Sequence, residues 1–376
     1  MRNRAEVIII GGGIQGISLA YHLAKRGLTD VCLLETEMLG SGSSGKSASV
    51  IGHAFQSETC LPLTRWSFEA LMRFEQETGV SPGYEPIGCL LIGGPQGMAE
   101  LRRRHQLLRG TGIENRLVDL EEIDRLMPGL NLAGIEGGLY LPRDGGLDPH
   151  SIMMGYAGQA RRRGVRFEEG VEALDLIQEN GRLRGVLTTV GPIEAEWVVN
   201  AAGSRAREVG SWAGLDLPIR NCKRHILVTG AVEGYSHPIP FTYEWEKGWY
   251  IRREGPGLLI GMGVQERAWD DQRVEPAFVE ELIEYASFRA PALEEAGLMT
   301  SWAGLRPLTP DDDPILGPAP QLAGFVNDCG WGGHGVMHAP AAGMALAELI
   351  AEGAARTLDL SPFRLERFDR TARPGT

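Results

Sequence analysis

The chain has 376 residues, of which 43% are hydrophobic, and this length is enough for two domains that each bury a core. The formal net charge is −12, which argues against nucleic acid and against anionic membrane surfaces as partners. Five cysteines without a CxxC pair argue against a zinc site and indicate a reducing compartment. We therefore expect a cytoplasmic protein without a bound metal.

A run of four β-branched residues, Val7–Ile10, follows a basic start, an order that a signal peptide would also show. The run ends at three glycines, so a buried strand explains it better, and no segment is long enough to span a membrane. The next residues, Gly11-Gly12-Gly13-Ile14-Gln15-Gly16, fit the GxGxxG pattern. A helix over residues 17–26 and a strand over residues 31–34 complete a dinucleotide-binding βαβ unit.

Each position of this unit meets a physical requirement. Gly11 permits a tight turn, Gly13 lets a pyrophosphate approach the backbone, and Gly16 lets the helix pack on the strand. The helix N-terminus supplies free N–H groups and a partial positive charge for phosphates. Glu35 ends the second strand about twenty residues further on, where an acid reaches the ribose hydroxyl groups.

The loop over residues 39–47 consists almost entirely of glycine and serine. Such a loop is either a flexible linker or backbone that lies against a large planar cofactor, and its place after a dinucleotide site favours FAD. Lys46 in this loop is either a solvated charge or a phosphate contact, and we favour the contact.

The rest of the chain alternates between helical and strand patterns. Helices are predicted over residues 62–79, 97–110, 149–163 and 337–351, and strands over residues 165–167, 171–177, 196–203 and 325–326. The basic run at residues 102–104 is expected to be a solvated helix face. Residues 219–263 alternate and are rich in aromatics, which predicts an antiparallel sheet.

These elements predict an α/β plus antiparallel-sheet (α+β) fold, with a Rossmann-like FAD-binding domain and an inserted antiparallel-sheet substrate domain. The FAD-binding domain is discontinuous in the chain. We assign residues 1–80, 140–215 and 312–376 to the FAD-binding domain, and residues 81–139 and 216–311 to the substrate domain.

Six segments in this order resemble those of FAD-dependent amino acid oxidoreductases, the family of D-amino-acid oxidase, glycine oxidase, sarcosine oxidase and the proline dehydrogenase beta subunit. They are the GxGxxG turn with Glu35, and residues 42–45, 144–149, 200–203, 302–311 and 333–343. The resemblance covers nearly the whole chain. The last segment, GHGVMHAPAAG, is most similar to sarcosine- and proline-dehydrogenase-type members.

The resemblance implies an enzyme that oxidises a small amino acid at the carbon next to nitrogen, giving an imine that hydrolyses. A secondary or N-alkyl amino acid such as sarcosine or proline is preferred, and oxygen or another acceptor reoxidises the flavin. A glycine or D-amino-acid oxidase or dehydrogenase is the enzymatic alternative. An FAD-bearing assembly or electron-transfer subunit without turnover is the non-enzymatic one, and partner subunits remain open.

The resemblance also implies roles for individual residues. Arg306 binds the substrate carboxylate, or else holds its own loop, and Tyr250 borders the substrate, or else is an ordinary sheet aromatic. His334 faces the flavin and could be protonated if its neighbours raise its pKa. His53 and His225 are expected to be packed or surface residues. FAD is expected to contact Gly11, Gly13, Ile14, Gln15, Gly16, Glu35, Thr36, Gly42, Ser43, Ser44, Lys46, Ser47, Ser49, Val171, Ala202, Gly203, Arg306, Gly332, Gly333, His334, Gly335, Val336 and Met337.

The chain departs from monomeric sarcosine oxidases at several positions. Ser49 and Gly52 stand where those enzymes have arginines, and Met337 stands where they bind the substrate carboxylate with a lysine. Leu259 replaces the lysine that they use with oxygen, which predicts a slow reaction of the reduced enzyme with oxygen. No cysteine near residues 302–309 could anchor the flavin, so we expect FAD to be held without a covalent bond.

Overall fold

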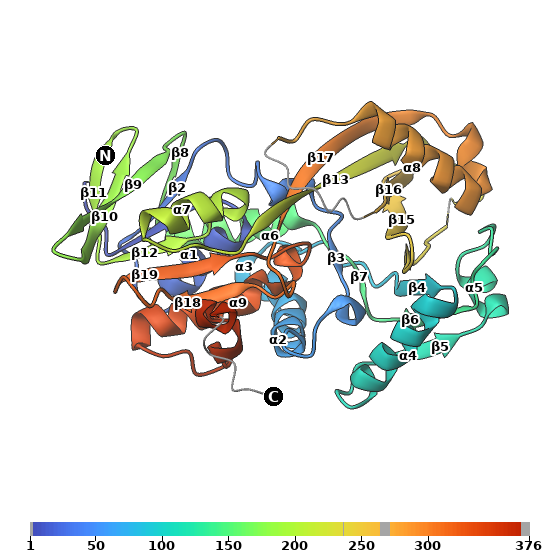
Figure 1. Ribbon diagram of the computed structural model, residues 1–376, viewed down its shortest axis with the longest axis horizontal. Coiled ribbons are helices and arrows are strands. Elements are labelled where there is room, and N and C mark those ends of the chain that lie inside the picture. The colour runs from blue at the N-terminus through green and yellow to red at the C-terminus, as the bar shows by residue number, and fades with distance from the viewer. Residues whose placement is uncertain (1–2, 236, 264–270, 370–376) are drawn as a thin grey trace.

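The structure is a computed structural model that describes residues 3–235, 237–263 and 271–369. Its two large sheets lie at opposite ends of an elongated molecule (Figure 1). The predicted domain ends at residues 1–2 and 370–376, and residues 236 and 264–270 of the predicted substrate domain, lie outside the described residues.

The first large sheet has six strands in the order β18-β19-β12-β1-β2-β8. All of its pairings are parallel except the one between β18 and β19. Most of its strands are continuous apolar runs because helices or strands cover both faces. The strands are β1 (Val7–Ile10), β2 (Val31–Glu35), β8 (Arg166–Glu169), β12 (Trp197–Asn200), β18 (Ile315–Pro318) and β19 (Phe325–Cys329).

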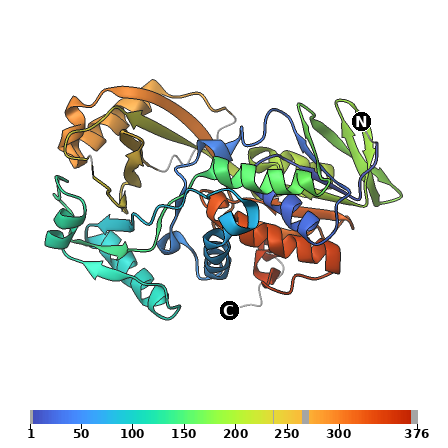
Figure 2. The same cartoon turned by 180° about the vertical axis from the view of Figure 1, so that it is seen from behind.

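Three helices lie side by side against one face of this sheet: α1 (Ile14–Lys25), α6 (Pro149–Arg162) and α9 (Gly335–Glu352) (Figure 2). The contact between α1 and α9 requires Gly343, because a Cβ atom there would lie 2.5 Å from Ser18 Oγ. The segment that begins at Gly333 therefore has a packing role in addition to any role in a site.

The second large sheet has eight strands in the order β17-β13-β16-β15-β14-β4-β6-β5, and only the β14–β4 pairing is parallel. Helices α4 (Pro95–Arg109), α5 (Leu120–Leu126) and α8 (Pro276–Arg289) pack around it (Figure 1). The strands are β4 (Cys89–Gly93), β5 (Arg116–Val118), β6 (Gly137–Leu141), β13 (Arg220–Thr229), β14 (Phe241–Glu244), β15 (Trp249–Glu254), β16 (Gly257–Gly261) and β17 (Leu298–Leu308).

Smaller elements complete the described chain. A three-stranded sheet covers the second face of the first large sheet, and a two-stranded sheet joins the segments between the large sheets. Their strands are β9 (Ala173–Glu179), β10 (Arg182–Thr188), β11 (Gly191–Glu194), β3 (Val50–Ile51) and β7 (Gly145–Gly146); the remaining α-helices are α2 (Leu61–Met72), α3 (Phe74–Thr78) and α7 (Ala206–Trp212). No helix of the described residues is long and apolar enough to cross a membrane.

The predicted fold class is confirmed, with one helix corrected. The helix expected over residues 62–79 is two helices, because Arg73 leaves the helical conformation and turns Phe74 into the core. The strands of the two large sheets come from the two predicted residue sets, except that β6 crosses the expected boundary at residue 139. The division into two domains stays a prediction.

Candidate active site

A cavity of about 730 Å³ runs between the two large sheets, which is a usual size for a cofactor and ligand site. The C-terminal ends of β1, β2, β12 and β19 form one end of it, together with the N-terminus of α1. The other end is lined by β13, β14, β15 and β17 and by the N-terminus of α9. Ligands of open α/β sheets bind at such carboxyl ends.

The glycine-rich turn has the geometry that the sequence predicts. Gly11 has φ +116°, and a Cβ atom there would lie 2.3 Å from the carbonyl oxygen of Ala201. A Cβ atom on Gly16 would lie 2.2 Å from the carbonyl oxygen of Gly11, so Gly16 serves the packing of α1. Gly13 differs, because a Cβ atom there would approach only Ser44 Oγ, at 3.3 Å. The backbone at Gly13 is therefore open toward the cavity.

Glu35 is fixed at the end of β2 by two backbone groups. The N–H of Gly12 donates to Glu35 Oε2 at 2.8 Å, and the N–H of Glu37 donates to Oε1 at 2.9 Å. Each carboxylate oxygen keeps further acceptor capacity. Glu35 also lines the cavity, so its geometry suits a ribose diol.

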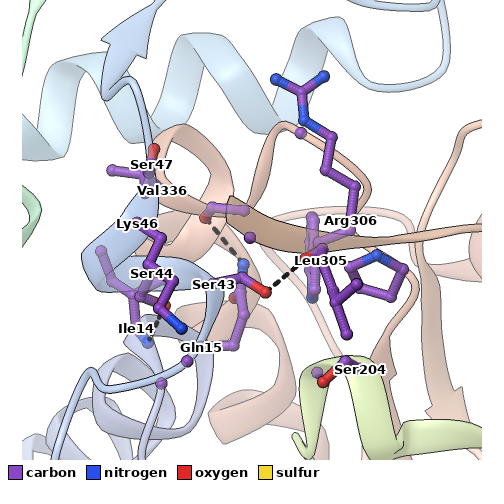
Figure 3. Close-up of a pocket in the computed structure, with 18 of the residues that line it drawn as sticks. Ile14, Gln15, Ser43, Ser44, Lys46, Ser47, Ser204, Leu305, Arg306 and Val336 are labelled. Carbon is purple, nitrogen blue, oxygen red and sulfur yellow. Dashed lines mark hydrogen bonds between the residues drawn. The ribbon is translucent and has the colours of Figure 1, made fainter. Parts of the chain in front are cut away.

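Three hydrogen bonds fix the serine-rich loop and its surroundings, and two of them involve the loop's own serine side chains (Figure 3). Ser43 Oγ donates to the carbonyl oxygen of Leu305 at 2.6 Å, and the N–H of Ile14 donates to Ser44 Oγ at 3.0 Å. Gln15 Nε2 donates to the carbonyl oxygen of Gly335 at 2.9 Å. These bonds connect the N-terminal ends of α1 and α9 with β17, so the loop is an ordered wall of the cavity and not a flexible linker.

Lys46 follows in the same loop and lines the cavity. Its Nζ donates to the side chain of Gln272, and its carbonyl oxygen accepts from Trp302 Nε1 at 3.2 Å. The structure thus gives its ammonium a protein partner, while the phosphate contact stays a prediction.

Arg306 occupies the other end of the cavity. Its guanidinium lies over Gly333, where a Cβ atom would be only 2.8 Å from Arg306 Cζ. Figure 3 shows the side chain extending from β17 on the side away from Ser204. Arg306 forms no hydrogen bond or ion pair with any residue that the structure describes. This geometry argues against the alternative that Arg306 holds its own loop through backbone carbonyls.

Tyr250 lies near Arg306 and lines the cavity. Its ring covers Gly261, where a Cβ atom would lie 2.2 Å from the hydroxyl oxygen. Burial raises the pKa of Tyr250, so the hydroxyl keeps its proton at neutral pH and can donate a hydrogen bond.

His334 is the N-cap residue of α9 and lines the cavity. Burial, together with the positive charges of Arg306 and Arg104, lowers its pKa from 6.5 to about 4. The expectation that neighbours could raise this pKa is therefore wrong. The imidazole is neutral at neutral pH, because a second positive charge beside Arg306 is unfavourable.

The structure brings together almost all the predicted site residues. Every predicted cofactor or catalytic residue lines the cavity except Gly16. None of the five cysteines lines it, and all five are free and buried. His53 and His225 are both buried, and neither lines the cavity. His53 Nδ1 forms a hydrogen bond with Asp144 Oδ1 at 2.6 Å, and His225 Nε2 accepts from the N–H of Glu275 at 3.1 Å. Leu259 is buried and is not a lining residue, so its effect on oxygen stays a prediction.

Sequence reasoning missed one arginine and several aromatics at the Arg306 end: Arg224, Phe55, Phe241 and Tyr243. One signal could have found Arg224. Residues two apart in a strand share a face, and Arg224 is two residues from Cys222, which pairs with Arg306.

The basic run at residues 102–104 also needs a correction. Arg104 is not solvated, because its guanidinium lies 4.7 Å from the Trp245 ring and donates to the carbonyl oxygens of Ala54 and Gln56. Only Arg102 and Arg103 are exposed.

The cavity fits a bound dinucleotide flavin. The open backbone at Gly13 leaves room for a pyrophosphate, and the N-termini of α1 and α9 offer N–H groups and partial positive charge at two points. Two buried side-chain oxygens of lining residues, Gln15 Oε1 and Asp328 Oδ2, have no partner in the described part of the chain. Such atoms are costly unless a ligand or water pairs them.

Asp328 gives a pH-dependent stability prediction. Burial raises its pKa from 3.8 to about 7, although Trp331 Nε1 donates to its Oδ1 at 2.9 Å. Since the folded state then binds a proton that the unfolded state releases, this residue should make stability fall as pH rises from 4 to 7. Asp328→Asn should gain stability over wild type at pH 8, by at most ~4 kcal/mol, and the gain should vanish near pH 4.

Urea unfolding of both proteins at a fixed FAD concentration measures this difference. Asp216→Asn, at an exposed position, is the matched control and should show no pH-dependent gain. A gain for Asp328→Asn that is the same at pH 4 and pH 8 would contradict the assignment.

The glycine-rich turn, Glu35 and the cavity at the carboxyl ends of the parallel strands define a dinucleotide-binding protein of the open α/β class. The model of the family described as FAD dependent oxidoreductase matches residues 6–349. The chain therefore belongs to this family.

Individual relatives agree with this assignment. Mitochondrial dimethylglycine dehydrogenase of Rattus norvegicus is 32% identical over 98% of this chain and 46% of its own length. Sarcosine oxidase subunit beta of Rhizobium meliloti (strain 1021) is 30% identical over 97% of this chain and 88% of its own length. The crystal structure of L-proline dehydrogenase from P. horikoshii has a TM-score of 0.91 and 28% identity, and the match covers 99% of both chains. The chain spans about half the length of the dimethylglycine dehydrogenases that it matches.

Proposed function

We propose that the protein oxidises a small amino acid at the carbon next to nitrogen, preferably a secondary or N-alkyl amino acid such as sarcosine, dimethylglycine or proline. The observation that carries the proposal is the Arg306 guanidinium, which lies at the cavity end opposite the dinucleotide turn and has no hydrogen-bond or ion-pair partner among the described residues. Such a guanidinium matches a carboxylate in a bidentate geometry. The names of the relatives, which act on amines of this kind, support it.

Different residues of this chain would bind the cofactor and orient the substrate. FAD, when bound, accepts the hydride equivalent from the substrate carbon. Gly13, Glu35 and the serine-rich loop would hold the dinucleotide, together with the other predicted cofactor residues. Arg306 would orient the substrate through its carboxylate, and the protonated Tyr250 hydroxyl would donate a hydrogen bond beside it. The neutral His334 imidazole can accept a hydrogen bond from the substrate amine, because burial and the Arg306 charge keep the imidazole unprotonated.

Anaerobic reduction of the flavin tests the proposal. We expect sarcosine, dimethylglycine or L-proline to bleach the flavin of the purified protein with one amino acid consumed per FAD. Glycine and D-alanine test the oxidase alternative in the same experiment. An FAD-bearing subunit without turnover would keep its oxidised spectrum with every amine, and this outcome would contradict the proposal.

We further propose that the enzyme is a dehydrogenase, with oxygen a poor acceptor. The apolar Leu259 and the dehydrogenase names of two relatives support this reading. Mixing the reduced protein with aerated buffer should give slow reoxidation, which a quinone or dye should accelerate. Peroxide release that keeps pace with turnover would identify an oxidase instead.

We also propose a cytoplasmic location, which the five free, buried cysteines support. Partner subunits are part of the proposal because one relative is, by its name, a subunit of a sarcosine oxidase. Cell fractionation and the native mass of the protein from its own cells test both points.

A further inference from the structure

A second guanidinium, that of the buried Arg224, lies beside the half-buried Arg306 at the same end of the cavity. In the register of β13 and β17, Cys222 pairs with Arg306 and Arg224 pairs with Gly304. Directly opposed residues point to the same face of a sheet, as do residues two apart in one strand. Arg224 and Arg306 are therefore diagonal neighbours on one face, with Cβ atoms roughly 7–8 Å apart. Gly304, opposite Arg224, has no side chain, and the Lys46 side chain packs against it, because a Cβ atom there would lie 3.3 Å from Lys46 Cβ.

Arg224 has no acidic partner in the described structure. It is 9% exposed, and its one hydrogen bond with described residues goes from Nη1 to the carbonyl oxygen of Lys223 at 2.8 Å. Burial lowers its pKa to about 10, and the charge of Arg306 acts in the same direction. The charge of Asp312 acts on both arginines, yet Asp312 is exposed and forms an ion pair with neither.

The three acidic residues that line the cavity belong to the dinucleotide end, and Asp312 is not a lining residue. Glu35 and Glu37 lie at or after the end of β2, and Asp328 is in β19 with Trp331 as its partner. A buried charge without a counter-ion is costly, and two adjacent like charges add to that cost. A bound anion is the ordinary means of offsetting both charges.

We propose that the substrate carries two carboxylates, one bound by Arg306 and the other by Arg224, so that the enzyme acts on N-substituted amino dicarboxylic acids. A monocarboxylic amino acid places its one carboxylate against Arg306 and leaves the Arg224 guanidinium without an anion. A second carboxylate gives the substrate a net negative charge and places one anion against each guanidinium. This inference rests on the proposed function for the amine, whereas the anion site can be tested by binding alone.

The aromatic side chains around the two arginines favour a ligand over bulk water at this end. Phe55 packs edge-on against Tyr243 at a centroid distance of 5.1 Å, and Phe241 lies 5.7 Å from Tyr250. Burial raises the pKa of Tyr243 as it does that of Tyr250, so neither hydroxyl neutralises an arginine. Apolar walls with a few convergent polar groups are typical of small-molecule sites.

Binding of matched acids to the FAD-loaded enzyme tests the proposal. Succinate and glutarate are compared with butanoate and pentanoate, which have the same chain lengths but one carboxylate, at constant ionic strength. Calorimetry and the change in the flavin spectrum give the dissociation constants. We expect the dicarboxylates to bind about tenfold to a hundredfold more tightly. Turnover of N-methylaspartate against N-methylalanine should show the same preference in kcat/KM.

The variant Arg224→Met should abolish the preference and leave monocarboxylate affinity unchanged, while Arg224→Lys should keep part of it. The control is Arg184→Met. Arg184 lies on β10 and forms an exposed ion pair with Glu179 of β9, so this variant should keep the full preference. If Arg224→Met weakens the binding of monocarboxylates and dicarboxylates by the same factor, the two arginines bind a single carboxylate together, and the proposal is overturned. Equal binding of both kinds by the wild-type enzyme would overturn it without any variant.

Failure of the proposed function gives a different result. If no amine bleaches the flavin but dicarboxylates bind preferentially and Arg224→Met removes the preference, amine oxidation fails and the anion site stands. If sarcosine bleaches the flavin and dicarboxylates show no preference, only the present inference fails.

Discussion

Replacement of Gly13 with valine is expected to give a folded protein that has lost its FAD. A Cβ atom at Gly13 approaches only Ser44 Oγ, at 3.3 Å, and the backbone there is extended, with φ −77° and ψ 178°, which valine adopts readily. The methyl groups would instead occupy the space of the pyrophosphate at the N-terminus of α1. We expect FAD affinity to fall at least about a hundredfold, or ~2.7 kcal/mol, since charge-assisted hydrogen bonds are lost.

Two other glycine variants make the experiment specific. Gly16→Val would overlap the carbonyl oxygen of Gly11 and should prevent folding, so its loss of FAD carries no information about the cavity. Gly297→Val has open space around it and should keep both the fold and the flavin. Absorbance of the purified proteins, circular dichroism and flavin titration separate these cases. A yellow Gly13→Val protein with wild-type affinity would contradict the pyrophosphate assignment.

The same wild-type preparation tests how FAD is attached. No cysteine lines the cavity, and we expect acid precipitation to release all of the flavin into the supernatant. Flavin that stays with the precipitated chain would show a covalent bond.

The dinucleotide end of the site could be predicted because its requirements are local in sequence. A tight turn, a close approach and a helix N-terminus each follow from single residues at fixed spacing, and Gly11, Gly16 and Glu35 have the predicted geometry. The small-residue loop was ambiguous by itself. Its order comes from Ser43 and Ser44, whose hydrogen-bond partners lie far away in sequence.

The substrate end could be predicted only in part, because its residues meet through strand pairing. Arg224 and Arg306 are brought together by the register of β13 and β17, which no local pattern specifies. The burial of Arg104 could not be predicted for the same reason, since a basic run on a helix usually faces water. Its burial depends on Trp245 and on two backbone carbonyl groups from a distant loop.

The pKa of His334 could not be predicted from the sequence either. A histidine in a glycine-rich loop before a helix says nothing about its neighbours, and the fold places Arg306 beside it. Burial is the largest cause of the lowered pKa of His334, and the positive charge of the half-buried Arg306 side chain acts in the same direction, so both disfavour the imidazolium.

Substitution of Arg306 is expected to weaken substrate binding while the protein stays folded and yellow. The guanidinium has no protein partner among the described residues, so Arg306→Met should leave no protein group newly unpaired. One lost charge-assisted hydrogen bond is worth roughly 1.5–3 kcal/mol, or about tenfold to a hundredfold in affinity. Arg306→Lys should recover only part of this, because a point charge replaces a planar fork.

FAD should remain bound in these variants because its predicted contacts are spread along the whole cavity, from the turn at Gly13 to the N-terminus of α9. The loop conformation should also survive, since Ser43 Oγ bonds to the backbone of Leu305 and not to the Arg306 side chain. Rapid mixing with sarcosine under anaerobic conditions gives the dissociation constant from the concentration dependence of flavin bleaching. Arg184→Met serves as the control for removal of a positive charge elsewhere.

The comparison with Arg224 distinguishes the roles of the two guanidinium groups. If Arg306 binds the carboxylate next to the amine, Arg306→Met must weaken monocarboxylic and dicarboxylic substrates alike, because both contain that carboxylate. Arg224→Met must affect only substrates with a second carboxylate. Unchanged substrate affinity in a folded, yellow Arg306→Met protein would mean that another residue binds the carboxylate, and Arg224, as the nearest guanidinium on the same sheet face, would then be the residue to test.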